Sequence, residues 1–184
     1  MNYTDLPVNL PIHEQDGACD HLLNMEIPSI SLPTTNGNLL KLNRTDTFRL
    51  VVYCYPMTGH PERSLPDNWN YIPGASGCTL QNCSFRDNYD EMIINNALPI
   101  GISTQSVEDI REMSNRLCLQ YDVLSDQQLL FTNTLKLPTF SIKNKKYIKR
   151  LTLIIEQSLI KHVFYPIFPP NKHITQVLDW LKNN

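Results

Sequence analysis

The feature that most limits how this chain can fold is a nearly continuous apolar run at residues 49–55, Arg-Leu-Val-Val-Tyr-Cys-Tyr, closed by Pro56. A strand with one face in solvent alternates polar and apolar residues, whereas a strand covered on both faces does not. The run therefore predicts a central strand with packed layers on both sides of its sheet.

Strand-like and helix-like segments alternate after this strand. Ser106, for example, offers an N-cap side chain to a segment whose apolar residues recur at helical spacing as far as Leu117. Alternating elements of this kind indicate an α/β fold, a three-layer sandwich in which helices flank a mixed central β-sheet. The predicted order is a helix at 80–96, a strand at 98–103, a helix at 106–117, a capped helical piece at 124–133, apolar runs at 139–142, 151–155 and 159–165, and a helix around 174–181.

The N-terminal part completes the predicted domain plan. Residues 27–32 and 39–42 flank Asn36-Gly37, a strong short-range hairpin signal, and predict an N-terminal β-hairpin. Residues 1–18 hold several turn and helix-ending signals and predict an extended arm. The remaining residues, 19–184, are expected to form one domain, because their number fits a domain of ordinary size.

Composition excludes several classes of function. The 184 residues carry 16 Lys and Arg against 18 Asp and Glu, a formal net charge of −2, so the chain lacks the basic surplus that binding to a phosphate backbone needs. No apolar run approaches the roughly 20 residues that cross a bilayer, and the N-terminus shows no secretory signal. The sequence predicts a cytoplasmic protein that binds neither nucleic acid nor membrane.

The compositional oddity is five cysteines, Cys19, Cys54, Cys78, Cys83 and Cys118. An odd number in a chain of this length is not typical of a secreted disulfide scaffold, so the thiols are expected to be reduced, metal-bound or reactive. Cys54 in the apolar strand and Cys118 beside a helical stripe are predicted to be packed and inert. Cys19 is predicted to be an ordinary surface thiol.

Half of a zinc site is one interpretation of Cys78 and Cys83. Structural zinc usually takes a second pair of ligands at short spacing, and the sequence has no other Cys-x2-4-Cys or His-x3-5-His pair. His60, His162 and His173 are far apart along the chain and are more simply surface or packed histidines. The sequence therefore predicts no metal site.

The segment around Cys78 predicts a reactive thiol. Gly74 and Gly77 allow a tight turn, and Cys78 then falls in the first turn of the predicted helix, where the positive end of the helix dipole favours the nucleophilic thiolate. In an intact helix Cys83 is about 7.5 Å further along the axis and roughly 140° around it. Because a disulfide needs Cα atoms within about 7 Å, the two sulfurs can bond only after the helix unwinds.

Five segments, taken in order, resemble a known family. Gly77-Cys78-Thr79-x-x-x-Cys83-x-Phe85-Arg86-Asp87 resembles the active-site segment of peroxiredoxins of the bacterioferritin comigratory protein (PrxQ) type, AhpC/TSA-like redoxins whose two cysteines share one helix. The resemblance covers about residues 19–184 and implies a thioredoxin-like fold. The other four segments are 20–37 with its hairpin, 51–56 ending in Tyr-Pro, the middle section from Ser103 to Asp126, and 150–155 beginning with Arg150.

The resemblance implies a thiol-dependent peroxidase that reduces hydrogen peroxide or organic hydroperoxides. Cys78 would be the peroxidatic cysteine that becomes a sulfenic acid, and Cys83 the resolving cysteine that condenses with it. Arg150 would hold the thiolate and polarise the peroxide, since a guanidinium stays charged and donates several hydrogen bonds. Thioredoxin or a similar dithiol would reduce the disulfide, and no cofactor or metal is implied.

Two departures from the family pattern affect the site. The family expects a hydroxyl residue three positions before the reactive cysteine and a proline seven before it, where this chain has Ala75 and Tyr71. Thr58 and Ser76 are level candidates for the missing hydroxyl. Residues 57–72 form an inserted loop where the family joins its segments almost directly, and loops of this length are often functional.

Two other functions stay open at this point. A thiol-disulfide oxidoreductase acting on protein disulfides would normally present Cys-x-x-Cys, which this chain lacks. A non-catalytic interaction module of the same fold would use the inserted loop and the aromatic segment 165–170 to bind a partner.

Basic runs are usually exposed, so a solvated charge beside Lys149 is the competing interpretation of Arg150. The oligomeric state is expected to be a monomer or a homodimer.

Overall fold

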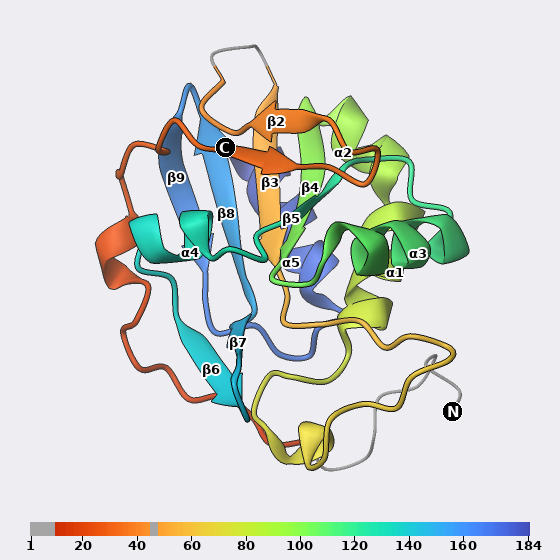
Figure 1. The fold of residues 1–184 in the computed structure, drawn as a ribbon. Coiled ribbons are helices and arrows are strands. Elements are labelled where there is room, and N and C mark those ends of the chain that lie inside the picture. Colours follow the sequence, from red (N-terminus) through yellow and green to blue (C-terminus); the bar gives the residue numbers. More distant parts are fainter. Residues whose placement is uncertain (1–9, 45–47) are drawn as a thin grey trace.

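The computed structural model describes residues 10–44 and 48–184, and its centre is a five-stranded sheet (Figure 1). The strands stand in the order β5 (Val123–Ser125), β4 (Ala97–Ser103), β3 (Arg49–Cys54), β8 (Leu151–Glu156) and β9 (Leu159–Phe164). β4 is parallel to β3 and β5, whereas β8 is antiparallel to β3 and β9. The predicted mixed sheet is confirmed, with the apolar run at its centre.

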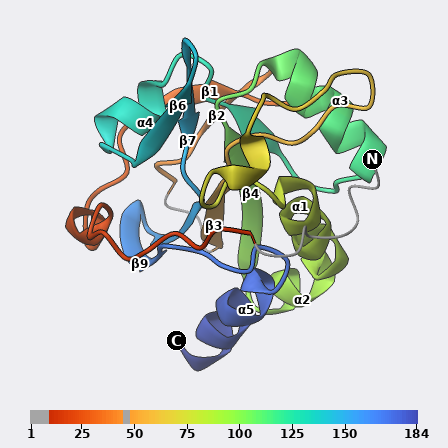
Figure 2. The same ribbon diagram turned by 90° about the horizontal axis from the view of Figure 1, so that it is seen from below.

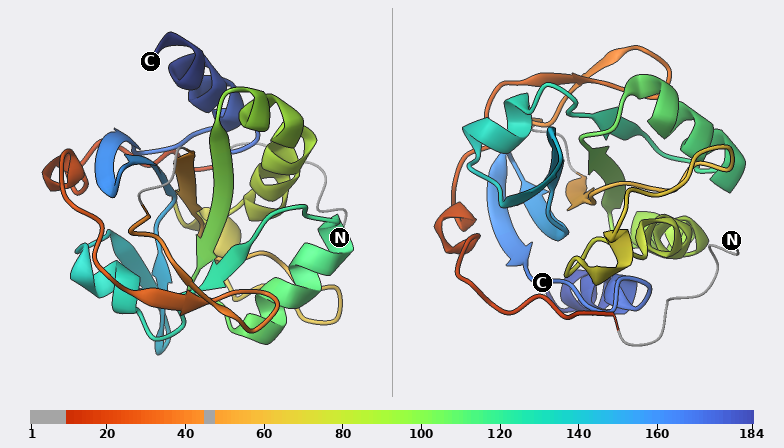
Figure 3. Two further views of the ribbon diagram at one scale, coloured as in Figure 1. Left: turned by 90° about the horizontal axis from the view of Figure 1, so that it is seen from above. Right: turned by 60° about the horizontal axis from the view of Figure 1, so that its bottom comes forward.

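The sheet is covered on both faces. Alternate residues of β3 point to opposite sides, so that Leu50, Val52 and Cys54 enter one hydrophobic core while Val51 and Tyr53 enter the other. We call these sides the Cys54 face and the Cys78 face. The Cys78 face is covered by α1 (Cys78–Asp87), α2 (Tyr89–Ile94), α3 (Val107–Leu117) and α5 (His173–Asn183), and the Cys54 face by α4 (Leu130–Thr134), the short 3-10 helix η1 (Asp20–Leu22) and the hairpin of β1 (Ser31–Pro33) and β2 (Leu39–Lys41) (Figure 3). The predicted three-layer arrangement is confirmed.

Two short hairpins lie beside the central sheet. β1 and β2 pair antiparallel on either side of Asn36-Gly37, so the predicted N-terminal hairpin is confirmed with shorter strands than expected. A second hairpin joins β6 (Thr139–Ile142) to β7 (Lys145–Ile148). β7 was not predicted, because it opens with two exposed lysines that interrupt the apolar pattern.

The predicted single helix over 80–96 is wrong in its length. Two helices, α1 and α2, meet at Asn88, whose φ of −112° and ψ of 17° depart from helical values. The side-chain amide of Asn88 donates to the carbonyl of Ser84 at 2.8 Å. Asparagine competes in this way with the backbone for hydrogen bonds, which favours a helix end. α1 is therefore a helix of ten residues with its own C-terminus.

The predicted helical piece over 124–133 is wrong in its first half. Val123–Ser125 extends the sheet as β5, because it pairs in parallel with β4. Asp126 follows it and accepts hydrogen bonds from the backbone N–H groups of Phe131 (3.1 Å) and Thr132 (2.8 Å). Asp126 therefore holds the start of the later and shorter helix α4, since it satisfies N–H groups that a first turn leaves unpaired.

The inserted loop, residues 57–72, has a small core of its own. Trp69–Tyr71 forms a 3-10 helix, and the Trp69 side chain is buried. The Trp69 ring meets the ring of Tyr147 edge-on at a centroid distance of 5.3 Å and lies 5.9 Å from that of Phe140. Seen from below, the loop lies between the β6–β7 hairpin and α3 (Figure 2). Trp69 is therefore the centre of this small core.

The N-terminal arm is described from residue 10 onward, and residues 1–9 lie outside the described residues. Residues 10–16 form no helix or strand. Asp16 Oδ2 accepts from Lys149 Nζ at 3.3 Å and from the Tyr165 hydroxyl at 3.2 Å. This part of the arm therefore lies against the chain next to Arg150.

Candidate functional site

Cys78 is the first residue of α1. The preceding Gly77 has φ 91°, a left-handed conformation that glycine adopts without strain and that turns the chain into the helix. The thiol is 3% exposed. It donates to the carbonyl of Ala75 at 3.3 Å, and its sulfur accepts from Arg150 Nη2 at 3.2 Å. The predicted position of Cys78 in the first turn of a helix is confirmed.

Arg150 is buried and points at this sulfur, so the interpretation as a solvated charge is wrong. It directly precedes β8 and is only 3% exposed. Besides Cys78, its Nη2 donates to the carbonyls of Ser76 (2.9 Å) and Gly74 (3.2 Å). A buried guanidinium needs hydrogen-bond acceptors, and the turn before α1 supplies them. These hydrogen bonds therefore hold the Arg150 side chain and the turn before α1 in place relative to each other.

Gln81 is a further site residue that the sequence did not reveal. It lies one helical turn after Cys78, is fully buried, and its Oε1 accepts from Arg150 Nη1. Four buried side-chain atoms of the described residues have no hydrogen-bond partner; one is Asn43 Oδ1, and the other three are Gln81 Nε2, Arg150 Nε and the hydroxyl of Tyr55. Buried polar atoms are nearly always paired, so three such atoms near one thiol are a feature of a site. The Tyr55 phenol packs in the same core as Cys78, and burial raises its pKa far above the usual value.

The two candidate hydroxyls bond elsewhere. Ser76 Oγ donates to Asn70 Oδ1 at 2.7 Å, and Thr58 Oγ1 donates to Gln105 Oε1 at 3.2 Å. Within residues 10–44 and 48–184, neither hydroxyl forms a hydrogen bond with the sulfur of Cys78. The structure therefore brings Arg150 and Cys78 together. A hydroxyl group that replaces the one missing from Ala75 stays a prediction.

Tyr53 tethers the first turn of α1 to the sheet. Its ring stacks on Phe85, with centroids 4.2 Å apart and planes 8° apart. Its hydroxyl donates to Asn82 Oδ1 at 2.7 Å, and Asn82 Nδ2 donates to the carbonyl of Cys78 at 2.9 Å. The central strand thus positions the cysteine through two hydrogen bonds and one ring contact.

Cys83 lies in the same helix as Cys78, as predicted, and both thiols are free. It is half-buried, and this desolvation raises the pKa of its thiol, although the nearby guanidinium of Arg86 opposes the shift. A raised pKa means that the protonated form predominates near neutral pH. Cys83 is therefore a weaker nucleophile in the folded helix than an exposed cysteine.

The other three cysteines differ from one another. Cys54 is fully buried, as predicted, and desolvation raises the pKa of its thiol. Cys19 was predicted to lie on the surface, which is wrong: it begins the turn into η1, packs in the Cys54 face, and burial raises its pKa to about 12. Cys118 was predicted to be packed, which is also wrong. Its φ of 53° just after α3 leaves the side chain exposed.

The three histidines considered above as metal ligands lie in different environments. His60 lies in the inserted loop, His162 stacks on the ring of Trp180, and His173 is buried with Nε2 2.9 Å from Thr152 Oγ1. Over the described part of the chain, no three His, Cys, Asp or Glu side chains gather as metal ligands. No helix there is long and apolar enough to span a membrane.

Solved structures share the fold. The chain is similar to peroxidoxin BcpB from Mycobacterium tuberculosis with a TM-score of 0.72 and 22% identity, over 88% of this chain and 96% of that one. A structure of peroxiredoxin Q from Xanthomonas campestris gives a TM-score of 0.68 and 18% identity, over 94% and 96% of the two chains. The predicted thioredoxin-like fold is confirmed.

The family model of the AhpC/TSA family matches residues 70–163, more than half of the chain, and the chain belongs to this family. Peroxiredoxin Bcp from Escherichia coli (strain K12) is 29% identical over 161 residues, 85% of this chain and 93% of its own length. The chloroplastic peroxiredoxin Q of Oryza sativa subsp. japonica is 25% identical over 157 residues, 85% of this chain and 64% of its own length. The predicted resemblance to Bcp and PrxQ peroxiredoxins is confirmed, and with it the assignment as a peroxiredoxin enzyme.

Proposed function

We propose that this peroxiredoxin reduces hydrogen peroxide or organic hydroperoxides through Cys78, with Arg150 as the group that stabilises the reacting charge. The observation that carries the proposal is the 3.2 Å contact from Arg150 Nη2 to Cys78 Sγ at the start of α1. Because the thiol is 3% exposed, a small peroxide fits this site better than a protein disulfide does.

In the first step the Cys78 thiol gives its proton to solvent, and the thiolate attacks the terminal oxygen of the peroxide. An S–O bond forms, the O–O bond breaks, and the leaving alkoxide or hydroxide takes up a proton. Sulfur supplies the two electrons and becomes a sulfenic acid. Arg150 lies where negative charge moves from sulfur to oxygen, and a fixed cation there lowers the barrier without reorganisation.

The unpartnered buried donors support a binding place for the peroxide oxygens. Gln81 Nε2 and Arg150 Nε carry hydrogens that no described residue accepts, and the Tyr55 hydroxyl can donate or accept. A peroxide offers two oxygen acceptors, so it would satisfy atoms that are costly to leave unpaired. We assign to Gln81 part of the role that the missing hydroxyl at Ala75 leaves open.

In the second step Cys83 attacks the sulfenic acid, a disulfide forms, and water leaves. The helix must open first, because the two cysteines stand five residues apart on α1. The break at Asn88 helps, since the ten residues of α1 can unwind without unwinding α2. Thioredoxin or another dithiol would return both thiols by exchange.

The test is a count of free thiols after one equivalent of hydrogen peroxide is added to the reduced protein. The wild type should lose two thiols rapidly, and Cys78→Ser should lose none at that rate. Cys83→Ser should retain a sulfenic acid at Cys78 that a dimedone probe captures. The matched control is Cys118→Ser, which removes an exposed thiol and should leave the kinetics unchanged.

One result would overturn the proposal: wild-type thiols that disappear no faster than those of free cysteine. A disulfide that forms in Cys83→Ser, or sulfenic acid that never appears there, would instead contradict the assignment of Cys83 as the resolving residue.

A further inference from the structure

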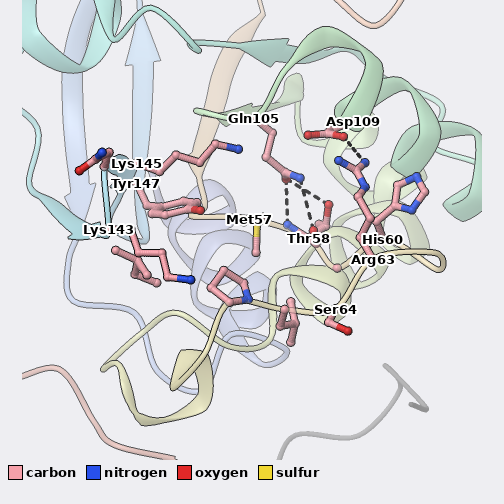
Figure 4. A pocket seen from close by; sticks show the side chains of 15 residues that line it. Met57, Thr58, His60, Arg63, Ser64, Gln105, Asp109, Lys143, Lys145 and Tyr147 are labelled. Atoms are coloured by element: carbon pink, nitrogen blue, oxygen red, sulfur yellow. Dashed lines mark hydrogen bonds and ion pairs between the residues drawn. The ribbon is translucent and has the colours of Figure 1, made fainter.

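A cavity of about 400 Å³ lies between the inserted loop, the start of α3 and the β6–β7 hairpin (Figure 4). Its lining does not include Cys78, Gln81 or Arg150, so it is separate from the thiol site. Volumes of this size are ordinary for small-molecule sites. The residues that line it include Met57, Arg63, Leu65, Ile142, Lys143 and Lys145.

The inner part of the cavity is apolar. Met57, Leu65 and Ile142 contribute side chains to it and also pack against the small core around Trp69 and Tyr147. In Figure 4 the Met57 side chain lies between the ammonium groups of Lys143 and Lys145 on one wall and the guanidinium of Arg63 on the other, and the Tyr147 ring lies beside the two lysines. Because that core supports the apolar side chains, they are held in place and can receive a hydrocarbon chain.

The rim of the cavity is cationic. Lys143 and Lys145 reach it from the β6–β7 hairpin, and Arg63 reaches it from the loop (Figure 4). Arg63 is paired with Asp109, the one acidic residue among the lining residues described. Lys143 lies 3.6 Å from Asp67, but both side chains are largely exposed, so this pair is weak. Lys145 forms no ion pair with any residue in 10–44 or 48–184, so the rim keeps a positive charge that no carboxylate of those residues neutralises.

We propose that this cavity binds a medium-chain aliphatic carboxylate, with the hydrocarbon chain on Met57, Leu65 and Ile142 and the carboxylate at Lys143 and Lys145. An apolar base below two cations selects an amphipathic anion over a neutral chain or a small inorganic ion. Each part contributes: methylene groups leave water for the apolar wall, and the carboxylate replaces the solvent around two ammonium groups.

The binding does not depend on the redox chemistry proposed above. The cavity and the thiol site are connected indirectly. Tyr147 packs in the same small core as Ala75, and the carbonyl of Ala75 accepts a hydrogen bond from the Cys78 thiol. Cys78→Ser therefore keeps the carboxylate site while it abolishes peroxide reduction. A peroxidase that binds no carboxylate, and a carboxylate-binding protein without peroxidase activity, are distinguishable results.

The test is calorimetric titration of the reduced protein with hexanoate, octanoate and decanoate below their micelle concentrations. Affinity should rise about fourfold for each added methylene group until the cavity is filled. 1-Octanol has nearly the same chain without the charge and should bind at least tenfold more weakly than octanoate. Absence of saturable binding, or equal binding of octanol and octanoate, overturns the proposal.

Variants of the hairpin locate the site. Lys145→Glu should weaken octanoate binding at least tenfold, since it reverses the charge at the rim. Lys146→Glu makes the same charge change one residue further along β7, on the side that does not line the cavity, and should leave the affinity within twofold. Equal losses in both variants would show a general effect of net charge and overturn the assignment to this cavity.

Discussion

The two faces of the sheet both bury cysteines, and they differ in what surrounds the sulfur. On the Cys54 face, Cys54 lies within an apolar core, and desolvation together with the nearby carboxylate of Asp126 and the thiol of Cys19 raises its pKa. On the Cys78 face, the sulfur of Cys78 is almost as buried, but it accepts a hydrogen bond from Arg150 at the start of a helix.

Burial of a cysteine and reactivity of its thiol are therefore separate properties in this protein. Burial alone disfavours a thiolate and makes a cysteine inert, whereas a fixed cation and a helix start stabilise the same charge. The two cysteines lie near one strand, β3, so their difference comes from side chains that meet the sulfur and not from depth in the protein.

The largest effect is expected from Arg150→Gln, which would make the surroundings of Cys78 resemble those of Cys54. Loss of the cation should lower the second-order rate constant with hydrogen peroxide by about 10²- to 10³-fold. Stopped-flow tryptophan fluorescence measures this constant. Arg150→Lys is the matched control, which keeps the charge but loses the planar fork and should recover part of the rate. A rate constant within threefold of wild type in Arg150→Gln would show that Arg150 is not what makes Cys78 more reactive than Cys54.

Acid is expected to destabilise the protein through His173, a buried residue of the Cys78 face. Burial, reinforced by the charge of Arg150 and opposed by a hydrogen bond with Gln176, lowers the pKa of His173 from 6.5 to about 4. The unfolded state therefore binds more protons between these values, so the free energy of unfolding should fall by about 2 kcal/mol as the pH drops from 7 to 5.

Urea unfolding at the two pH values measures the difference. His173→Gln removes the titrating group and should flatten that part of the pH profile, whatever its own effect on stability. A slope in His173→Gln equal to that of the wild type would assign the acid sensitivity to other groups.

A smaller effect is expected from Gln81→Ala, which removes one acceptor of Arg150 and one unpartnered donor. The rate constant with hydrogen peroxide should fall about tenfold, the cost of one hydrogen bond to a charged group. Gln81→Met fills the same volume without polar atoms and should be equally slow, which separates a lost hydrogen bond from a cavity. Recovery of the rate in Gln81→Met would show that Gln81 acts by packing alone.

The smallest effect on reactivity is expected from Cys54→Ala, the control for the other face. Its sulfur is buried in an apolar core, so peroxide kinetics should stay within twofold of wild type while the free energy of unfolding falls by about 1 kcal/mol. Peroxide kinetics and urea unfolding on the same preparation check both statements. A large loss of rate would show that the two faces are coupled.

Much of the fold was predictable because burial leaves a pattern in the chain. The run that became β3 is apolar on both sides, and the apolar stripe of α5 has helical spacing. The break at Asn88 was not predictable, since apolar residues keep helical spacing across it. β7 was hidden by Lys145 and Lys146, whose exposure depends on the hairpin that they form.

The candidate site was predictable in part for a similar reason. Cys78 and Cys83 stand at a spacing that has a chemical meaning, and Arg150 was located by resemblance. Gln81 carries no such signal, because a polar residue on a helix normally faces solvent. Its burial results from a contact with Arg150 that joins positions far apart in the chain.

Gly101 on β4 sets a limit on how this protein can vary. A Cβ atom built at that position would lie 2.9 Å from the hydroxyl oxygen of Tyr53 and 3.3 Å from Val123 Cγ1. The same hydroxyl holds Asn82, and through it the carbonyl of Cys78. Even alanine at 101 would displace the phenol. In a library of random variants this distant, chemically silent position should tolerate change as poorly as the cysteine itself.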